Sequence, residues 1–266
     1  MQNLFRSNNY HNAFRMQLIS TLVRIKFNKI VNSKSTSIQK IMGFKVTPLD
    51  LRTLCTLFDE IFVEGSYYID IDNEQPEIVD CGSNIGMAIL FFKKLFPRCK
   101  VTAFEPDLQT FTTLLKNIAV NKLSDVKAYN VAVSNEEGEI SFYSDPKVPG
   151  SGLMSIIDAR SDMGNEIRVK TVKLSSYISR EIDLLKLDVE GAENQVFQDL
   201  DESGKLALVK NMIIEYHHHM RANDDNLSYI LSTLERNGFG YQLSDTLRLP
   251  FVKNVYQVGL IYAYKK

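Results

Sequence analysis

Short apolar strands alternate with helices through the middle of this chain, and this alternation is its most restrictive feature. The apolar run Ile78–Cys81 leads into a glycine loop, and Ile85–Phe96 then has apolar residues at helical spacing up to Pro97. Lys100–Phe104 is a second apolar run, followed by another helical pattern. Strands that alternate with helices of this length predict an α/β fold with a mostly parallel sheet covered on both faces.

The same periodicities extend the pattern along the chain. We predict helices at residues 50–58, 108–120, 192–200 and 226–237, and strands at 126–133, 138–143, 168–174, 182–187, 209–216, 239–243 and 255–264. Residues 62–70 are predicted to form a short strand or hairpin, and residues 145–165 a loop. No helical pattern separates the last two strands, so we expect the final strand to be antiparallel.

Charge divides the chain into two parts. The first 49 residues carry eight basic residues and no acidic one, so the other 217 carry 23 basic and 32 acidic residues. Apolar residues between Phe14 and Ile30 recur at mostly helical spacing among these basic residues, which predicts an amphipathic helix. We therefore expect a basic helical N-terminal extension at residues 1–48 and an α/β domain at residues 49–266.

Three interpretations of the basic extension remain open: a cap packed on the sheet, a helix lying on an anionic membrane, or a nucleic-acid-binding segment. The acidic remainder of the chain disfavours nucleic acid. Apolar runs such as Met87–Phe92 are far shorter than the roughly 20 residues that span a bilayer. Three cysteines form a poor disulfide framework, so we expect a cytoplasmic protein, with peripheral membrane contact through the extension as one alternative.

The loop after the first apolar strand has the order Asp-Cys-Gly-Ser-Asn-Ile-Gly. Its glycines let a ligand approach the backbone, and the following helix offers free N–H groups. The loop lacks G-x-G-x-x-G and a Gly-Lys-Ser/Thr sequence, and its acid would repel a pyrophosphate. A cofactor with a ribose and an ammonium group but no phosphate, such as S-adenosylmethionine, fits better. The candidate binding residues are Asp80, Gly82, Ser83, Asn84 and Gly86.

Glu105 ends the second strand. In doubly wound folds an acid at this place accepts hydrogen bonds from ribose hydroxyls. The alternative is an ordinary strand-end acid beside a structural turn. Asp80 and Glu105 at consecutive strand ends favour the cofactor interpretation.

Three segments resemble the FkbM family of class I methyltransferases. They are residues 78–106, the segment Asn-Val-Ala-Val-Ser at 130–134, and the segment Leu-Lys-Leu-Asp-Val-Glu-Gly-Ala-Glu at 185–193. The resemblance spans about residues 62–243. It implies a Rossmann-like, doubly wound sheet of seven strands that binds S-adenosylmethionine. It also implies methyl transfer, usually to a hydroxyl of a sugar or natural product. By motif order alone, Asn130 is expected near the adenine.

Transfer to a hydroxyl needs a base, because alcohols are poor nucleophiles. Asp188, Glu215 and His217 follow or end later strands, so they should share one edge of the sheet with the cofactor loop. We expect these three to position and deprotonate the acceptor, with His217 as a neutral imidazole base. Glu190 is a further candidate base.

Other interpretations of these residues stay open. The histidine run at 217–219 could be a solvated loop, and Asp188, Glu215 and His217 could instead bind a metal, although no spacing is diagnostic. Lys186 is interpreted as a partner for a nearby carboxylate. Tyr67 is either a residue of the pocket wall or an apolar filler.

The sequence thus predicts an S-adenosylmethionine-dependent O-methyltransferase that acts on a carbohydrate, glycan or natural-product hydroxyl, without a nucleic-acid partner. One alternative is a nicotinamide-dependent oxidoreductase, which the missing G-x-G-x-x-G argues against. The other is a catalytically silent methyltransferase-like interaction module. The sequence indicates neither the acceptor nor the oligomeric state.

Overall fold

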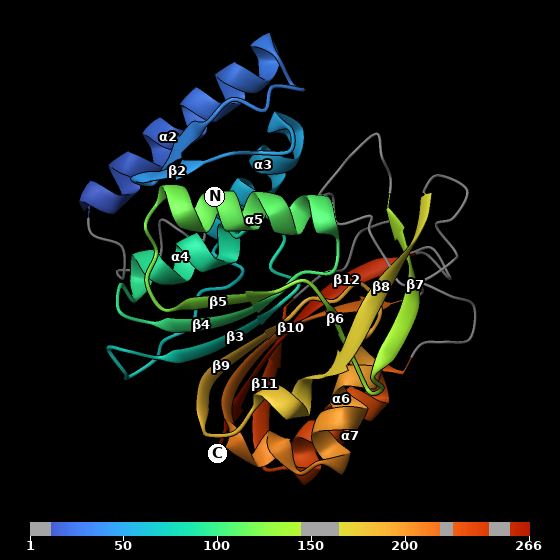
Figure 1. The fold of residues 1–266 in the computed structure, drawn as a ribbon. Coiled ribbons are helices and arrows are strands. Elements are labelled where there is room, and N and C mark those ends of the chain that lie inside the picture. The colour runs from blue at the N-terminus through green and yellow to red at the C-terminus, as the bar shows by residue number, and fades with distance from the viewer. Residues whose placement is uncertain (1–11, 145–164, 219–225, 245–255) are drawn as a thin grey trace.

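The computed structural model describes residues 12–144, 165–218, 226–244 and 256–266 (Figure 1). Its centre is a seven-stranded sheet with the order β11-β12-β10-β9-β3-β4-β5. The strands are β3 (Glu77–Cys81), β4 (Lys100–Phe104), β5 (Val126–Tyr129), β9 (Ile182–Leu187), β10 (Val209–His218), β11 (Phe239–Leu243) and β12 (Gln257–Lys265). Only β12 runs antiparallel to its neighbours in this sheet. The predicted doubly wound α/β fold with an antiparallel last strand is confirmed.

The strand order reverses at β3. From there the chain moves outward through β4 and β5 on one side, and later through β9 and β10 on the other. Ligands of open parallel sheets bind beyond the carboxyl ends of the strands at such a reversal. The topology therefore places the expected site where β3, β4, β9 and β10 end.

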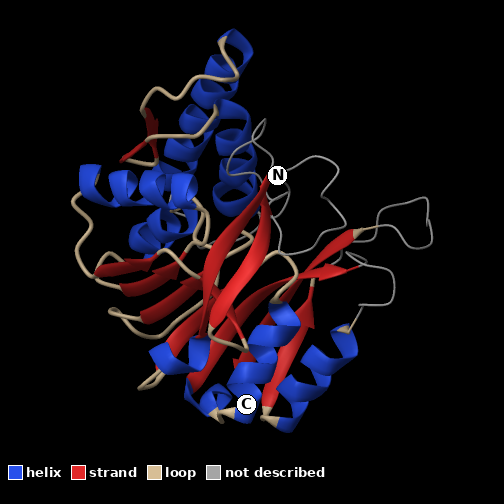
Figure 2. Cartoon of the chain, turned by 45° about the vertical axis from the view of Figure 1, so that its right-hand side comes forward, coloured by secondary structure: helices blue, strands red, loops and turns tan. Residues whose placement is uncertain are grey.

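Helices cover both faces of the sheet (Figures 1 and 2). Successive side chains of a strand point to opposite faces, and Leu184 and Leu185 accordingly belong to two different hydrophobic cores. One face is covered by α4 (Met87–Leu95) and α5 (Leu108–Val120), and the other by α6 (Glu193–Glu202) and α7 (Leu227–Arg236). Short 3₁₀ turns, η3 (Leu174–Tyr177) and η4 (Lys205–Leu208), flank the second layer.

The N-terminal segment packs onto the first of these layers. It consists of α2 (Asn12–Val31), a hairpin of β1 (Gln39–Ile41) and β2 (Phe44–Val46), and α3 (Leu51–Phe58). The side-chain amides of Asn117 and Asn121 on α5 exchange hydrogen bonds with the backbone of Thr47 and Lys45, at 2.6–3.1 Å. These bonds fasten the segment to α5. Within the described residues, no helix is both long and apolar enough to cross a bilayer.

The predicted strand or hairpin at residues 62–70 is wrong. The chain instead continues from α3 into a π-helix, η1 (Asp59–Glu64), which ends at Gly65 with a φ of 73°. Ile61, Phe62 and Val63 are all buried there. A short apolar run fits a buried strand or a buried helix equally well, and packing against α4 and α2 decides for the helix.

The predicted strand at residues 126–133 is divided in two. After β5 the chain leaves the main sheet, and β6 (Ala132–Ser134) joins β7 (Gly138–Ser144) and β8 (Asn165–Lys173) in a second sheet of order β6-β8-β7. Asn130 lies at the division and donates from its amide to the carbonyls of Glu105 and Pro106, both at 2.9 Å. These bonds tie the end of β5 to the end of β4.

Candidate active site

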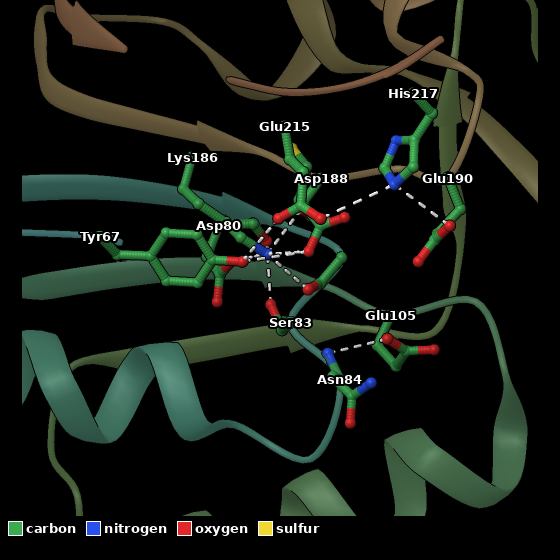
Figure 3. A network of polar contacts seen from close by, with 12 residues as sticks. Tyr67, Asp80, Ser83, Asn84, Glu105, Lys186, Asp188, Glu190, Glu215 and His217 are labelled. Atoms are coloured by element: carbon green, nitrogen blue, oxygen red, sulfur yellow. Dashed lines mark hydrogen bonds and ion pairs between the residues drawn. The ribbon is translucent and has the colours of Figure 1, made fainter. Parts of the chain in front are cut away.

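A cavity of about 320 Å³ lies at the carboxyl ends of the central strands. The loop Gly82–Asn84 and Glu105 line one end, and Asp188, Glu190 and Glu215 line the other, as Figure 3 shows. Residues of α3 and η1 line it as well, among them Glu60. The cavity therefore joins the expected cofactor loop to the expected catalytic residues.

The glycine loop passes very close to the end of β9. Gly82 has a φ of 79°, and a Cβ there would lie 1.8 Å from the carbonyl oxygen of Asp188, so only glycine fits. Gly86 begins α4 with a φ of 93°, and a Cβ there would lie 2.8 Å from Leu114. Gly82, Ser83 and Asn84 line the cavity, whereas Gly86 is not among its lining residues.

Glu105 is 3% exposed, and two backbone groups hold its carboxylate. Asn84 N–H donates to Oε2 and Asp107 N–H donates to Oε1, both at 2.9 Å. Burial raises the pKa of Glu105 to about 8, against the opposing effect of the Asp107 hydrogen bond. The acid is thus fixed in orientation between the glycine loop and the start of α5.

Asp80 lies beneath the loop, fully buried, and is not among the lining residues. Lys186 Nζ lies 3.3 Å from Asp80 Oδ1 and 3.2 Å from Asp188 Oδ2, and it donates to the carbonyl of Gly82 at 2.7 Å. The interpretation of Lys186 as a carboxylate partner is confirmed. Burial opposes the charge, but the two aspartates outweigh it and raise the pKa of Lys186.

Three oxygen-bearing groups converge at the other end of the cavity. The hydroxyl of Tyr67 donates to Asp188 Oδ2 and to Glu215 Oε2, each at 3.3 Å. Burial and the charge of Asp188 raise the pKa of Glu215 to about 8 and that of Glu60 to about 7. Tyr67 lines the cavity, so the wall interpretation of this residue is confirmed.

His217 lies within β10 with only 5% of its surface exposed, so the solvated-loop interpretation is wrong for this residue. Its Nδ1 lies 2.7 Å from Glu193 Oε1, and its Nε2 lies 3.3 Å from Glu190 Oε2 and 3.8 Å from Glu215 Oε1. Burial alone would lower the pKa of His217, but Glu193, Glu190 and Asp188 raise it to about 10. His217 is therefore a cation at neutral pH, in contrast to the expected neutral imidazole. His219 lies outside the described residues.

The structure also brings together a set that could hold a metal ion. Asp188, Glu190 and His217 each offer one atom within 4.8 Å of the others. This set contains Glu190 where the sequence suggested Glu215. A protonated His217 has no lone pair to offer, so metal binding there would require loss of a proton.

Sequence reasoning missed Glu60. It lies in η1 and lines the cavity, as does Arg52 of α3, and neither belongs to a recognisable motif. The one available signal was an acid adjoining the apolar run Ile61–Val63, which points to a buried carboxylate. Asn130 was expected near the adenine, but it is not among the lining residues, whereas Val131 is.

A model of the methyltransferase FkbM domain matches residues 80–241, which contain the glycine loop, Glu105, Lys186 and the acidic cluster. The chain belongs to the FkbM methyltransferase family. This membership confirms the resemblance and makes the protein an S-adenosylmethionine-dependent methyltransferase.

The chain is also similar to individual known proteins. Methyltransferase sdnD of Sordaria araneosa is 30% identical over 60% of this chain and 73% of its own length. The 31-O-demethyl-FK506 methyltransferase FkbM of Streptomyces tacrolimicus is 27% identical over 69% of this chain and 80% of its own. A solved FkbM methyltransferase from Methylobacillus flagellatus KT has 16% identity and a TM-score of 0.47, over 80% of this chain and 54% of its own.

The residues present fit the cofactor of this family. The Gly82–Asn84 loop lines the cavity, and Glu105 supplies an oriented buried carboxylate for hydroxyl groups. Phe104, Pro106 and Val131 line the same cavity and add apolar surface suited to a planar ring.

Proposed function

We propose that this FkbM methyltransferase is an O-methyltransferase that transfers a methyl group to a hydroxyl of a carbohydrate, glycan or natural product. One observation carries the proposal: a single cavity joins the Gly82–Asn84 loop and Glu105 to the cluster of Tyr67, Asp188 and Glu215. A methyl donor and a hydroxyl acceptor need this pair of environments side by side.

At the cofactor end, S-adenosylmethionine when bound supplies an electrophilic methyl group on a sulfonium. Glu105 accepts hydrogen bonds from the ribose hydroxyls, and Val131 and its apolar neighbours contact the adenine. The Gly82–Asn84 backbone holds the methionine portion. Asp80 supports this loop through Lys186, which also donates to the carbonyl of Gly82. Asn130 positions Glu105 by holding its carbonyl.

At the acceptor end, Glu215 takes the hydroxyl proton, and Asp188 and Tyr67 orient the acceptor. Glu215 lines the cavity, and a base whose pKa lies near the working pH is efficient. His217 is not among the lining residues, and it lies 3.8 Å from Glu215. We assign it a positioning role, in which its charge offsets those of Glu190 and Glu215.

A relative supports the hydroxyl acceptor. The Streptomyces tacrolimicus protein is named for methylation of 31-O-demethyl-FK506, a substrate in which the acceptor atom is oxygen. Oxygen acceptors need a base more than amines do, and the cluster around Glu215 supplies one.

Calorimetry with S-adenosylhomocysteine and with NAD tests the cofactor assignment. We expect S-adenosylhomocysteine to bind, and Glu105→Ala to weaken it by about tenfold or more, because a charge-assisted hydrogen bond is worth about 1.5–3 kcal/mol. Glu139→Ala, at an exposed glutamate on β7, is the matched control and should bind normally. Binding of NAD alone would contradict the proposal in favour of an oxidoreductase, and equal affinity in Glu105→Ala would favour a silent module.

Transfer of labelled methyl groups from S-adenosylmethionine to extracted glycans tests the acceptor class. Label that is stable to base but released by ether cleavage indicates an O-methyl product. Label on nitrogen would contradict the proposal. Running the reaction with a chelator, then with added Mg²⁺, shows whether Asp188, Glu190 and His217 bind a metal during turnover.

A further inference from the structure

Helix α2 is apolar on two opposite faces. One face is buried: Leu18 is 6% exposed and Ile25 is fully buried against α3 and the layer behind it. The opposite face is exposed from Met16 to Val31. Its members are Met16 (72% exposed), Ile19 (47%), Val23 (65%), Phe27 (63%), Ile30 (83%) and Val31 (70%).

These exposed residues form one continuous stripe, which we call the outer stripe. They recur at intervals of three and four residues, so on a helix of 3.6 residues per turn they lie along one side. Figure 1 shows α2 at the outer edge of the molecule, on the side of α4 and α5. Single exposed apolar residues are common, but a stripe along a whole helix marks a surface that contacts something else.

Basic residues flank the outer stripe. Arg24 lies on one side of it and Lys26 on the other, and both are exposed. The exposed Lys29 lies on the opposite face, four residues after the buried Ile25. One of these cations has an acidic partner, since Lys26 Nζ lies 3.1 Å from Asp59. The first 49 residues contain no acid, so every charged side chain that α2 itself places beside the stripe is basic.

We propose that the outer stripe docks onto an anionic lipid surface. The apolar side chains enter the boundary between headgroups and acyl chains, while Arg24 and Lys26 contact lipid phosphates. Charge argues against a second copy of this chain as the occupant, because two acid-free basic segments would face each other. It also argues against nucleic acid, since the centre of this surface is apolar and its cations lie at the margins.

The attachment is peripheral, and it leaves the catalytic cavity intact. Helix α3, on which α2 packs, supplies Arg52 and Thr56 to the cavity wall. Ile25 connects the two helices, because its carbonyl accepts a hydrogen bond from the thiol of Cys55 at 3.7 Å. Docking through the outer stripe therefore uses the face of α2 opposite to the one that holds α3.

Co-sedimentation of the full chain with vesicles tests the proposal. We expect binding to vesicles of equal parts phosphatidylglycerol and phosphatidylcholine, and much weaker binding to phosphatidylcholine alone. The double variant Val23→Asp with Phe27→Asp should lower the partition coefficient by more than about tenfold, because both side chains lose their apolar contact. Leu115→Asp makes the same change at an exposed leucine of α5 and should bind like the wild type.

A second pair of variants separates charge from insertion. Arg24→Gln with Lys26→Gln should weaken binding to the anionic vesicles by about thirtyfold, at roughly 1 kcal/mol per basic residue. The exposed pair Lys116→Gln with Lys127→Gln removes the same charge elsewhere and should have little effect. Thermal unfolding should show no large loss of stability in any of these variants, since every changed side chain is exposed.

Several results would overturn the proposal. One is a wild-type chain that stays in the supernatant with anionic vesicles, and another is unchanged binding by Val23→Asp with Phe27→Asp. Light scattering that shows a dimer dissolved by the same variant would identify a second copy as the occupant. Tight binding of a labelled RNA that depends on Arg24 and Lys26 but not on Val23 and Phe27 would identify nucleic acid.

Discussion

The two ends of the cavity, which we propose hold the cofactor and the acceptor, are built from different kinds of group. At the cofactor end, the backbone of Gly82–Asn84 and one carboxylate held by two backbone N–H groups form the surface. At the acceptor end, ionisable side chains from η1, the segment before β3, and the ends of β9 and β10 meet one another. The first arrangement depends on chain geometry, whereas the second depends on which protons are bound.

Their electrostatics differ in the same way. Burial raises the pKa of Glu105 to about 8, while the N–H groups of Asp107 and Asn84 favour its charged form. Burial also raises the pKa of Glu215 to about 8, but there the charges of Asp188 and Glu60 act in the same direction as burial. Two backbone N–H groups thus favour the ionised form of Glu105, whereas two neighbouring carboxylates disfavour the ionised form of Glu215.

Gly82→Ala should have the largest effect, because it breaks the geometry of the cofactor end. A Cβ at this position would lie 1.8 Å from the backbone carbonyl oxygen of Asp188. Neither the glycine loop nor the end of β9 can shift to relieve this clash without a large cost in free energy. We expect no measurable S-adenosylhomocysteine binding by calorimetry and a lower melting temperature.

Gly204→Ala is the control for backbone strain alone. Gly204 also has a positive φ, of 69°, but a Cβ there would meet nothing within 4 Å. This variant should lose about 1 kcal/mol of stability and keep cofactor affinity. Equal cofactor affinity in the two variants would show that the close approach of the loop to β9 is not needed.

Glu215→Gln should lower kcat by about 10²–10⁴-fold, because it removes the proposed base. S-adenosylhomocysteine affinity should change little, since Glu215 lies at the acceptor end. Glu215 is protonated below its pKa of about 8, so the wild-type rate should rise with pH through that value. The variant should lack this rise.

Steady-state kinetics from about pH 6 to about pH 9 check this prediction. Glu139→Gln, at an exposed residue of β7, provides the matched control. A Glu215→Gln enzyme with wild-type kcat and the same pH profile would show that another residue is the base. Asp188 would then be the next candidate in the cavity wall.

Of these variants, His217→Gln should change cofactor binding and turnover least, and its effect on stability tests the charge balance of the acceptor end. The pKa of His217 is raised from 6.5 to about 10 in the folded protein. A raised pKa means that the folded state binds the proton more tightly. Its stabilising contribution is complete below about pH 6.5 and is lost as the pH rises to about 10.

Urea unfolding of the wild type should therefore show a free energy of unfolding that falls across this pH range. In His217→Gln the free energy of unfolding should decrease less over the same pH range. Glu193→Gln, which removes the partner 2.7 Å from Nδ1, should lessen this decrease as well. A parallel pH dependence in all three proteins would contradict a cationic His217 in the folded state.

The cofactor end could largely be anticipated from the order of residues. The loop at 80–86 and Glu105 lie within one strand-helix-strand unit, so their relation follows from short-range connectivity. Even so, the sequence did not show that Gly82 must be glycine because of the backbone of Asp188, more than a hundred residues away. It also did not place Asp80 beneath the loop, paired with Lys186, outside the cavity lining.

The acceptor end was anticipated only in part. Strand-end reasoning brought Asp188 and Glu215 to one edge, where the structure has them. Glu60 was missed because the segment around it forms a π-helix, which the apolar run Ile61–Val63 does not distinguish from a strand. The alternation of the chain also gave no sign that β6 leaves the main sheet after Asn130.

The sequence by itself determined the α/β architecture, the cofactor loop and the membership of the FkbM family, because these depend on local periodicity and on residues close together in the chain. Only the tertiary structure decided the protonation states and the partners of α2. The pKa of His217 depends on Glu193 and Glu190, and the exposure of the outer stripe depends on which face of α2 packs on α3. Burial and charge act through space, and the segments that determine them here are distant in the sequence.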